Sequence, residues 1–310
     1  MKQRVFIALL ITAILLSLTG CSGGATPDSA SPDSATPDQT SAIRHHLVKS
    51  VKSYQKDVNT GKWELQNTVS VTYLNAYPTL IETVYTDKET KPAKTTCRYT
   101  FDGELPKTCV ETDSSSTGKK TVAYQNGRVY DVSNETGMAG NYTKMYYQYG
   151  NDDDYFTMVL QETHETASGD NPAATNEEVD SVSVTTENGL LKKTVNTGMY
   201  ANWANGEKKE WLRFRGVYTA DYDSDGIVSV MTGDFGKDGT SVENRFAVTR
   251  EDGRITEVVV QIPDEGDSLL DLTKYEFEYN DTEISPARYS LMMNYFIVGN
   301  QSNYYHYNWY

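Results

Sequence analysis

The chain has 310 residues and a formal net charge of −15, a length that suits one large or two small domains. Nucleic acids are bound through basic surfaces, so this acidic balance argues against a nucleic-acid partner. The 23 tyrosines and 4 tryptophans are the one compositional excess, whereas the 3 cysteines are few enough to be considered one at a time.

The first residues have the order of a secretory signal peptide. Lys2 and Arg4 form a short cationic segment, and an apolar run over residues 5–18 follows it. A helix of about 14 residues rises about 21 Å, which is short of the ~30 Å hydrocarbon core of a bilayer. The run therefore indicates a signal peptide rather than a permanent transmembrane helix.

The signal peptide ends in Leu18-Thr19-Gly20-Cys21. This sequence resembles the lipobox of bacterial lipoproteins, in which small residues precede a cysteine that becomes the lipidated N-terminus. The resemblance implies cleavage before Cys21, acylation of Cys21 and a membrane anchor on the extracytoplasmic face, at the outer surface or in the periplasm. Two or three acyl chains exceed the single chain that gives only reversible membrane binding. An ordinary signal peptide with a chance cysteine is the alternative.

Residues 21–41 predict a disordered stalk. Three pentads, TPDSA, SPDSA and TPDQT, follow one another over residues 26–40. The segment has no large apolar side chain, so it cannot bury enough surface to offset its chain entropy. Proline at every fifth residue favours extended conformers. A single folded domain is then expected over residues 42–310.

This domain is predicted to be mainly β, an antiparallel meander of many hairpins. Asp-Gly or Asn-Gly occurs seven times, and these dipeptides accept the positive φ of tight hairpin turns. Alternating stretches such as residues 274–280, Lys-Tyr-Glu-Phe-Glu-Tyr-Asn, place one face in the core and the other in water. An open curved sheet, a half-barrel and a sandwich all fit this pattern.

Two helices are predicted at the ends of the domain. The first covers residues 41–58, where Ser41 would be the N-cap and apolar side chains recur at steps of three and four. These side chains are Ile43, Leu47, Val51, Tyr54 and Val58. A short C-terminal helix is expected after Ser285-Pro286, an N-cap followed by proline, and is expected to end at Gly299.

Cys97 and Cys109 remain as an even pair once Cys21 is lipidated, which favours a disulfide in an exported chain. A three-residue loop centred on Gly103 would place the two cysteines directly opposite each other in one hairpin. The ring would stabilise the fold by roughly 3 kcal/mol in the chain-entropy model. A redox pair is the alternative, although the Cys-x-x-Cys spacing is missing.

Residues 221–226, Asp-Tyr-Asp-Ser-Asp-Gly, match the opening of a calcium-binding loop. Asp221, Asp223 and Asp225 would supply carboxylates around a bend at Gly226. Thr232 stands at the twelfth position, where an EF-hand has a bidentate glutamate, and the flanking residues predict strands. A polar hairpin turn without a cation is therefore the alternative.

The same region has a loose repeat. Tyr222–Ile227 approximates the order aromatic-x-x-Asp-Gly-x-hydrophobic, and Phe235–Thr240 and Val248–Ile255 follow it less closely. This order resembles the tyrosine-aspartate repeats of bacterial cell-surface proteins over residues 210–280. The resemblance implies a β-meander and carries no active site with it.

Exposed aromatic rings are the candidate ligand-binding groups, because rings with polar tips suit sugars and peptides. The candidates are Trp203, Trp211, Tyr304, Tyr305, Tyr307 and Trp309. Tyrosine is also a favoured residue of sheets, so packing between strands is the alternative role.

The sequence leaves three functions open. The first is a tethered binding or adhesion module for an envelope glycan, peptide or protein. The second is a carrier of a lipid or other apolar ligand, which a large cavity with aliphatic walls would support. The third is an envelope hydrolase, which a cleft between two carboxylates would support, although the sequence has no catalytic or zinc-binding motif. No cofactor is expected apart from calcium at residues 221–225.

Overall fold

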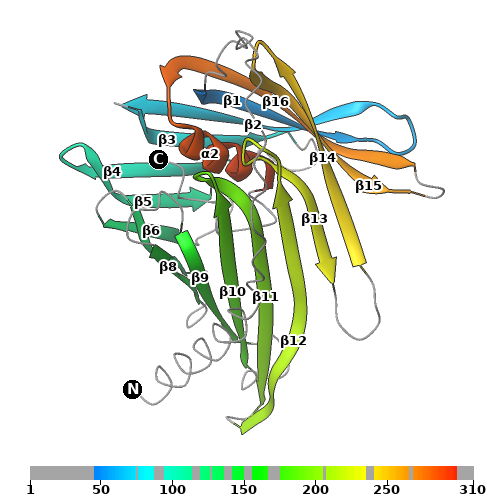
Figure 1. Ribbon diagram of the computed structural model, residues 1–310. Coiled ribbons are helices and arrows are strands. Elements are labelled where there is room, and N and C mark those ends of the chain that lie inside the picture. Colours follow the sequence, from blue (N-terminus) through cyan, green and yellow to red (C-terminus); the bar gives the residue numbers. More distant parts are fainter. Residues whose placement is uncertain are drawn as a thin grey trace, which may run out of the picture. The chain divides into compact units, whose positions relative to one another are not determined.

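The computed structural model describes residues 45–74, 76–86, 94–113, 119–125, 128–135, 142–149, 156–166, 175–204, 207–234, 241–264 and 268–298, all within the compact unit Ser41–Tyr310. In these ranges the chain forms sixteen strands and one helix (Figure 1). They are β1 (His46–Lys56), β2 (Trp63–Leu74), β3 (Tyr77–Tyr85), β4 (Lys94–Asp102), β5 (Leu105–Asp113), β6 (Lys119–Gln125), β7 (Arg128–Glu135), β8 (Tyr142–Tyr149), β9 (Phe156–Thr166), β10 (Thr175–Glu187), β11 (Leu190–Ala204), β12 (Glu207–Tyr222), β13 (Val228–Asp234), β14 (Ser241–Glu251), β15 (Arg254–Pro263), β16 (Leu269–Glu283) and α2 (Pro286–Val298).

The sheet is an antiparallel meander that closes on itself. Each strand pairs with the next one along the chain, and β1 also pairs with β16, which gives a closed barrel. The sequence did not decide how the sheet is arranged, but its prediction of a mainly β meander with a short C-terminal helix is confirmed. Within the described part of the chain, no helix combines the length and the hydropathy that crossing a bilayer requires.

The predicted Asp-Gly and Asn-Gly turns explain how neighbouring strands connect at one end of the barrel. Asn188 and Gly189 have φ values of 54° and 75°, and Asp252 and Gly253 have φ values of 49° and 77°. Two successive residues with positive φ are the signature of a type I′ turn, whose twist matches that of the strands. These dipeptides therefore set the short connections β10–β11 and β14–β15.

The barrel wall is apolar inside and charged outside. On β1, for example, Val51 and Ser53 are buried at 2% and 9% exposure, whereas the alternate residue Lys52 pairs with Glu278 of β16. Further ion pairs join Lys56 to Asp271 and Lys94 to Glu82. Side chains of a strand alternate between the two faces, so the described parts of these strands present their charged face to water and their apolar face to the interior.

The predicted N-terminal helix is wrong over residues 46–56, which form strand β1. Steps of three and four apolar residues suggested a helix, but the pairing of β1 with β16 is irregular between His46 and Val48 and again between Val48 and Ser50. Such irregularities add a residue on one strand and interrupt the alternation of side chains. Leu47, Val48 and Val51 are therefore all buried, at spacings that mimic a helix.

The predicted C-terminal helix is present as α2. Ser285 is its N-cap, since Ser285 Oγ accepts a hydrogen bond from the backbone N–H of Arg288 at 3.4 Å. Most of its side chains are buried, including Met292, Met293 and Asn294, which have no exposed surface. A helix that is buried on all sides lies in the core of a protein. Here α2 lies against the inner face of the sheet, where it contacts β1 and β11.

Buried hydrogen bonds clamp α2 to the turn between β12 and β13. Ser290 Oγ and Asn294 Nδ2 both donate to the backbone oxygen of Gly226, at 2.6 Å and 2.8 Å. Asn294 Oδ1 in turn accepts the N–H of Val228 at 2.9 Å. Buried polar groups of a turn need such partners, so these two side chains fix the position of the helix inside the barrel. We call these four residues the turn clamp.

His45 is expected to make the stability of the fold depend on pH. Its ring lies tilted against that of Tyr289 of α2, with centroids 4.5 Å apart. Burial lowers the pKa of His45, an effect that Asp225 opposes and that His46 and Arg250 reinforce. The imidazole of His45 therefore binds a proton less readily in the folded chain than in the unfolded chain, where its pKa is 6.5. The free energy of unfolding is expected to fall as the pH drops through that value. Urea unfolding above and below pH 6.5 should show that His45→Gln loses less free energy of unfolding at the lower pH than the wild type does. An equal loss in the two proteins would assign the pH dependence to other groups.

Candidate functional site

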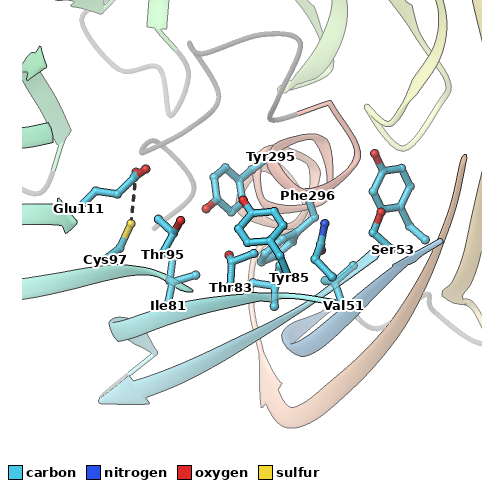
Figure 2. Close-up of a pocket in the computed structure, with 13 residues that line it drawn as sticks. Val51, Ser53, Ile81, Thr83, Tyr85, Thr95, Cys97, Glu111, Tyr295 and Phe296 are labelled. Atoms are coloured by element: carbon cyan, nitrogen blue, oxygen red, sulfur yellow. Dashed lines mark hydrogen bonds between the residues drawn. The ribbon is translucent and has the colours of Figure 1, made fainter. Parts of the chain in front are cut away.

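A pocket of about 140 Å³ lies in the barrel interior between α2 and strands β1–β5 and β16 (Figure 2). Its walls follow the alternation of the strands, because two or three alternate residues from each of β1, β2, β3 and β4 face it. These inward residues include Val51, Val69, Ile81, Thr83, Tyr85 and Thr95. α2 contributes Tyr295 and Phe296, directly after the clamping residue Asn294. The pocket therefore depends on the closure of the barrel and on the position of the helix.

The lining combines aromatic rings with hydroxyl groups and one carboxylate. Aromatic rings come from β3, β16 and α2, as Tyr85, Tyr275, Tyr295 and Phe296. The carboxylate is that of Glu111 on β5, whose Oε2 accepts a hydrogen bond from Cys97 Sγ at 3.5 Å (Figure 2). The pocket is therefore lined by ring faces, hydroxyl groups and a carboxylate, the mixture of apolar and polar groups found in small-molecule sites.

Cys97 and Tyr295 at the pocket are held in their protonated, neutral forms. A hydrogen bond with Cys109, burial and the nearby Glu111 raise the pKa of the Cys97 thiol well above its usual value. Burial, followed by the nearby Cys97 and Glu111, also raises the pKa of Tyr295. Cys97 is thus a poor nucleophile, and the Tyr295 hydroxyl keeps its proton.

The predicted pairing of the two cysteines is wrong in register. The turn at Gly103 has two residues, so Asp102 pairs with Leu105, and an irregularity between Thr100 and Phe101 shifts the register by one further residue. Tyr99 therefore pairs with Cys109 and Cys97 with Glu111. Cys97 and Cys109 are therefore diagonal neighbours, about 7–8 Å apart at Cα, a separation that a disulfide spans only if the backbone moves. Both are buried free thiols in this structure. A disulfide between them stays a prediction.

Each of the three aspartates that were predicted to bind calcium already has a cationic side chain of this protein as its partner. Arg250 Nη2 donates to Asp223 Oδ2 at 3.1 Å and to Asp225 Oδ2 at 2.7 Å. Asp221 lies 3.9 Å from the ammonium of Lys193. Asp223 Oδ1 also accepts the backbone N–H groups of Asp225 and Ile227, which is the role of an aspartate in a turn. Calcium binding here stays a prediction, and it requires the side chain of Arg250 to move away from Asp223 and Asp225.

Removing Arg250 is expected to make the turn responsive to calcium. In Arg250→Ala the carboxylates of Asp223 and Asp225 lose their cation and can share a Ca²⁺ ion, which prefers carboxylate oxygens. Millimolar calcium should then raise the melting temperature of the variant and leave that of the wild type unchanged. A calcium-dependent rise in the wild type would show that the turn binds the ion with Arg250 present.

The other predicted site residues are only partly placed. Trp203 and Trp211 belong to β11 and β12, but their side chains lie outside the described part of the structure. Cys21 and the tail residues Tyr304, Tyr305, Tyr307 and Trp309 lie outside it entirely. Their assignments as lipidated residue and ligand-binding rings therefore stay predictions.

Sequence reasoning did not single out Tyr85, Glu111, Tyr295 or Phe296. One signal was available for the last two, since Leu291 to Val298 is apolar on nearly every side of the helix, which indicates a helix inside the core. Tyr85 and Glu111 carry no local signal that distinguishes them from other strand residues. The pairing of β3, β4 and β5 brings them to one face of the sheet.

Comparisons with known proteins find similar solved structures but no matching family. No protein-family model matches the chain, and no curated protein matches it either. A crystal structure of a porin-like protein from Bacteroides uniformis is similar over 76% of this chain and 98% of its own, with 9% identity and a TM-score of 0.46. One from Bacteroides vulgatus is similar over 76% of this chain and 100% of its own, with 10% identity and a TM-score of 0.42.

Proposed function

We propose that this chain is a membrane-tethered, extracytoplasmic binding protein that holds a small ligand inside its barrel. The interior pocket carries this proposal, because it gathers rings, hydroxyl groups and a carboxylate from six strands and α2. Convergent polar groups among apolar walls are typical of small-molecule sites. The signal peptide and the lipobox-like sequence before Cys21 support the location.

The pocket favours this role over the other two functions that the sequence left open. A volume of about 140 Å³ is small for a lipid chain, and the lining is not the aliphatic surface that a lipid carrier needs. Glu111 is the one carboxylate among the lining residues, whereas a glycoside hydrolase needs two that flank the substrate. Binding of a small molecule with polar and apolar parts uses all the groups present.

The tether is tested at Cys21. A Cys21→Ala chain keeps its signal peptide but loses the acceptor of the acyl chains. We expect the wild type to sediment with membranes and to need detergent for release, and the variant to lose this membrane association. A variant that is processed normally and still partitions with membranes would favour an ordinary signal peptide and remove the tether from the proposal.

The pocket is tested by filling it. Thr83→Phe places a ring in the cavity, whereas Thr68→Phe places the same ring between Asn67 and Val69 on the outer face of the neighbouring strand β2. Small-molecule fractions of the growth medium should raise the melting temperature of the wild type and of Thr68→Phe, because ligands that bind the folded state stabilise it. Thr83→Phe should show no rise. A fraction that stabilises Thr83→Phe as strongly as the wild type would place the binding site elsewhere.

A further inference from the structure

The inner face of four neighbouring strands carries one row of paired side chains across the pocket. Tyr275 of β16 pairs with Ser53 of β1. Ser53 pairs in turn with Asn67 of β2, and Asn67 pairs with Tyr85 of β3. All four residues line the pocket, so a hydroxyl group and an amide lie side by side between two aromatic rings. Resting on the proposed function, we propose that the ligand of the pocket is a neutral monosaccharide, bound as a single ring.

The polar side chains of the pocket call for a ligand that both donates and accepts hydrogen bonds. Ser53 is only 9% exposed. Within the described ranges, no hydrogen bond engages the side chain of Ser53 or Asn67, or those of Thr83 and Thr95, which pair with each other in the next row. Buried polar groups are nearly always hydrogen-bonded, and a molecule in the pocket is within reach of these four. Hydroxyl and amide groups each donate and accept, so a ligand with several hydroxyl groups matches them.

Aromatic rings complete the match to a sugar. The C–H groups on one face of a pyranose ring form an apolar surface, against which amphipathic aromatic side chains pack. Tyr85 and Tyr275 flank the Ser53–Asn67 pair, and α2 brings Tyr295 and Phe296 to the same pocket (Figure 2). The C–H face of a sugar can therefore lie against rings while its O–H groups meet hydroxyl and amide groups.

The charges at the pocket favour a neutral ligand. Glu111 is the one charged residue among the lining residues, and Lys120 of β6 lies directly opposite it in the sheet. Cys97 also donates a hydrogen bond to Glu111. The chain thus places a cation and a donor of its own close to this carboxylate, so the pocket does not require a charged sugar.

The dimensions of the pocket limit the ligand to one ring. A volume of about 140 Å³ is close to that of a cavity of about 150 Å³ that takes one benzene ring. Neighbouring strands lie about 4.8 Å apart, so the backbones of Tyr275 and Tyr85, three strand spacings apart, are separated by about 14 Å. This leaves room for a single ring between the two tyrosine side chains. The pocket is partly open, so the substituents of a pyranose can extend from it.

The experiment is saturation-transfer NMR of the full exported chain in mild detergent. The probes are glucose, galactose, mannose, xylose, fucose and N-acetylglucosamine, and each is compared with tetrahydropyran-2-methanol, which has the ring of a hexose without its ring hydroxyl groups. Irradiation of the aromatic protons of the protein should saturate the C–H protons of at least one sugar. This sugar should bind about tenfold or more tightly than tetrahydropyran-2-methanol, because several hydrogen bonds distinguish them. If no sugar binds, or if tetrahydropyran-2-methanol binds as well, the ligand is not a monosaccharide.

Two serines provide the matched variants. Ser53→Ala removes the buried hydroxyl group and should weaken binding of the sugar by about threefold to tenfold, the effect of one hydrogen bond. Ser70→Ala removes a hydroxyl group from an exposed position of β2, where Ser70 pairs with Ser50, and should leave the affinity unchanged. Asn67→Leu removes a donor and an acceptor and should weaken binding by about tenfold or more. An unchanged affinity in Ser53→Ala would overturn the proposal, whether or not Asn67→Leu folds.

This test is independent of the one for the proposed function. A ligand that stabilises the wild type but not Thr83→Phe, and that proves not to be a sugar, leaves the binding function intact and contradicts the monosaccharide. Stabilisation of Thr83→Phe and wild type alike contradicts the binding function at this pocket.

Discussion

Gly226→Ala is expected to lower the free energy of unfolding by about 2–4 kcal/mol. Gly226 has a φ of 71°, and a Cβ atom there would lie 2.7 Å from Ser290 Oγ and 3.2 Å from the backbone nitrogen of Leu191. The methyl group would push Ser290 away from the oxygen of Gly226 and so break the turn clamp. Urea unfolding of the two proteins measures the difference.

Gly189→Ala is the control for backbone strain alone. Gly189 has a similar φ of 75°, but a Cβ atom at this position meets nothing within 4 Å. Its cost should be the left-handed backbone conformation, about 1 kcal/mol. If the two alanine variants lose the same free energy, the close approach of Gly226 to α2 does not contribute to stability.

Asn294→Leu should destabilise the chain to a similar degree, by about 2–4 kcal/mol. The substitution keeps the approximate volume of the side chain but leaves the N–H of Val228 without the acceptor Asn294 Oδ1. It also removes one of the two donors to the oxygen of Gly226. Because Asn294 is fully buried, water cannot replace these bonds without entering the core.

The consequence of Asn294→Leu extends to the pocket. Tyr295 and Phe296 follow Asn294 on α2, so a helix that shifts within the barrel moves two walls of the pocket. Thermal unfolding measures the loss of stability, and Asn59→Leu, in the exposed turn between β1 and β2, is the control. A melting temperature unchanged in Asn294→Leu would mean that apolar contacts alone hold α2 in place.

Much of the fold could be predicted from local patterns. Asn188-Gly189 and Asp252-Gly253 adopt the positive φ values that their sequence favours, and Ser285 caps α2 as expected. These features depend on residues close together in the sequence, which is why they could be predicted. The closure of the sheet depends on pairing between β1 and β16, more than two hundred residues apart, and no local pattern encodes it.

The two main errors have physical causes. In β1, Leu47, Val48 and Val51 follow a helix-like spacing because irregular pairing shifts the alternation of the strand. At Gly103, a turn of two residues instead of three shifts the register by one residue, and the irregular pairing between Thr100 and Phe101 shifts it by one more, so the pairs along the hairpin change. Cys97 consequently lies opposite Glu111, which brings a thiol and a carboxylate together at the pocket.

The pocket itself could not have been predicted, because its chemistry comes from residues that are each ordinary in their own strand. Tyr85 stands between a valine and a threonine, and so does Glu111, like many other strand residues of the chain. They acquire a role only when the barrel closes and α2 brings Tyr295 beside them. The outer wall shows the opposite case, since Glu278, which pairs with Lys52 there, belongs to the alternating stretch of residues 274–280 from which a solvent-facing side was predicted.

The measurement that tests the central claim most directly is native mass spectrometry of the full exported chain, released from its own membranes in mild detergent. The wild type should carry an added small-molecule mass that organic solvent removes, and Thr83→Phe, purified in the same way, should not carry it. An identical added mass on both proteins, or none on the wild type, would contradict a ligand held in the barrel interior.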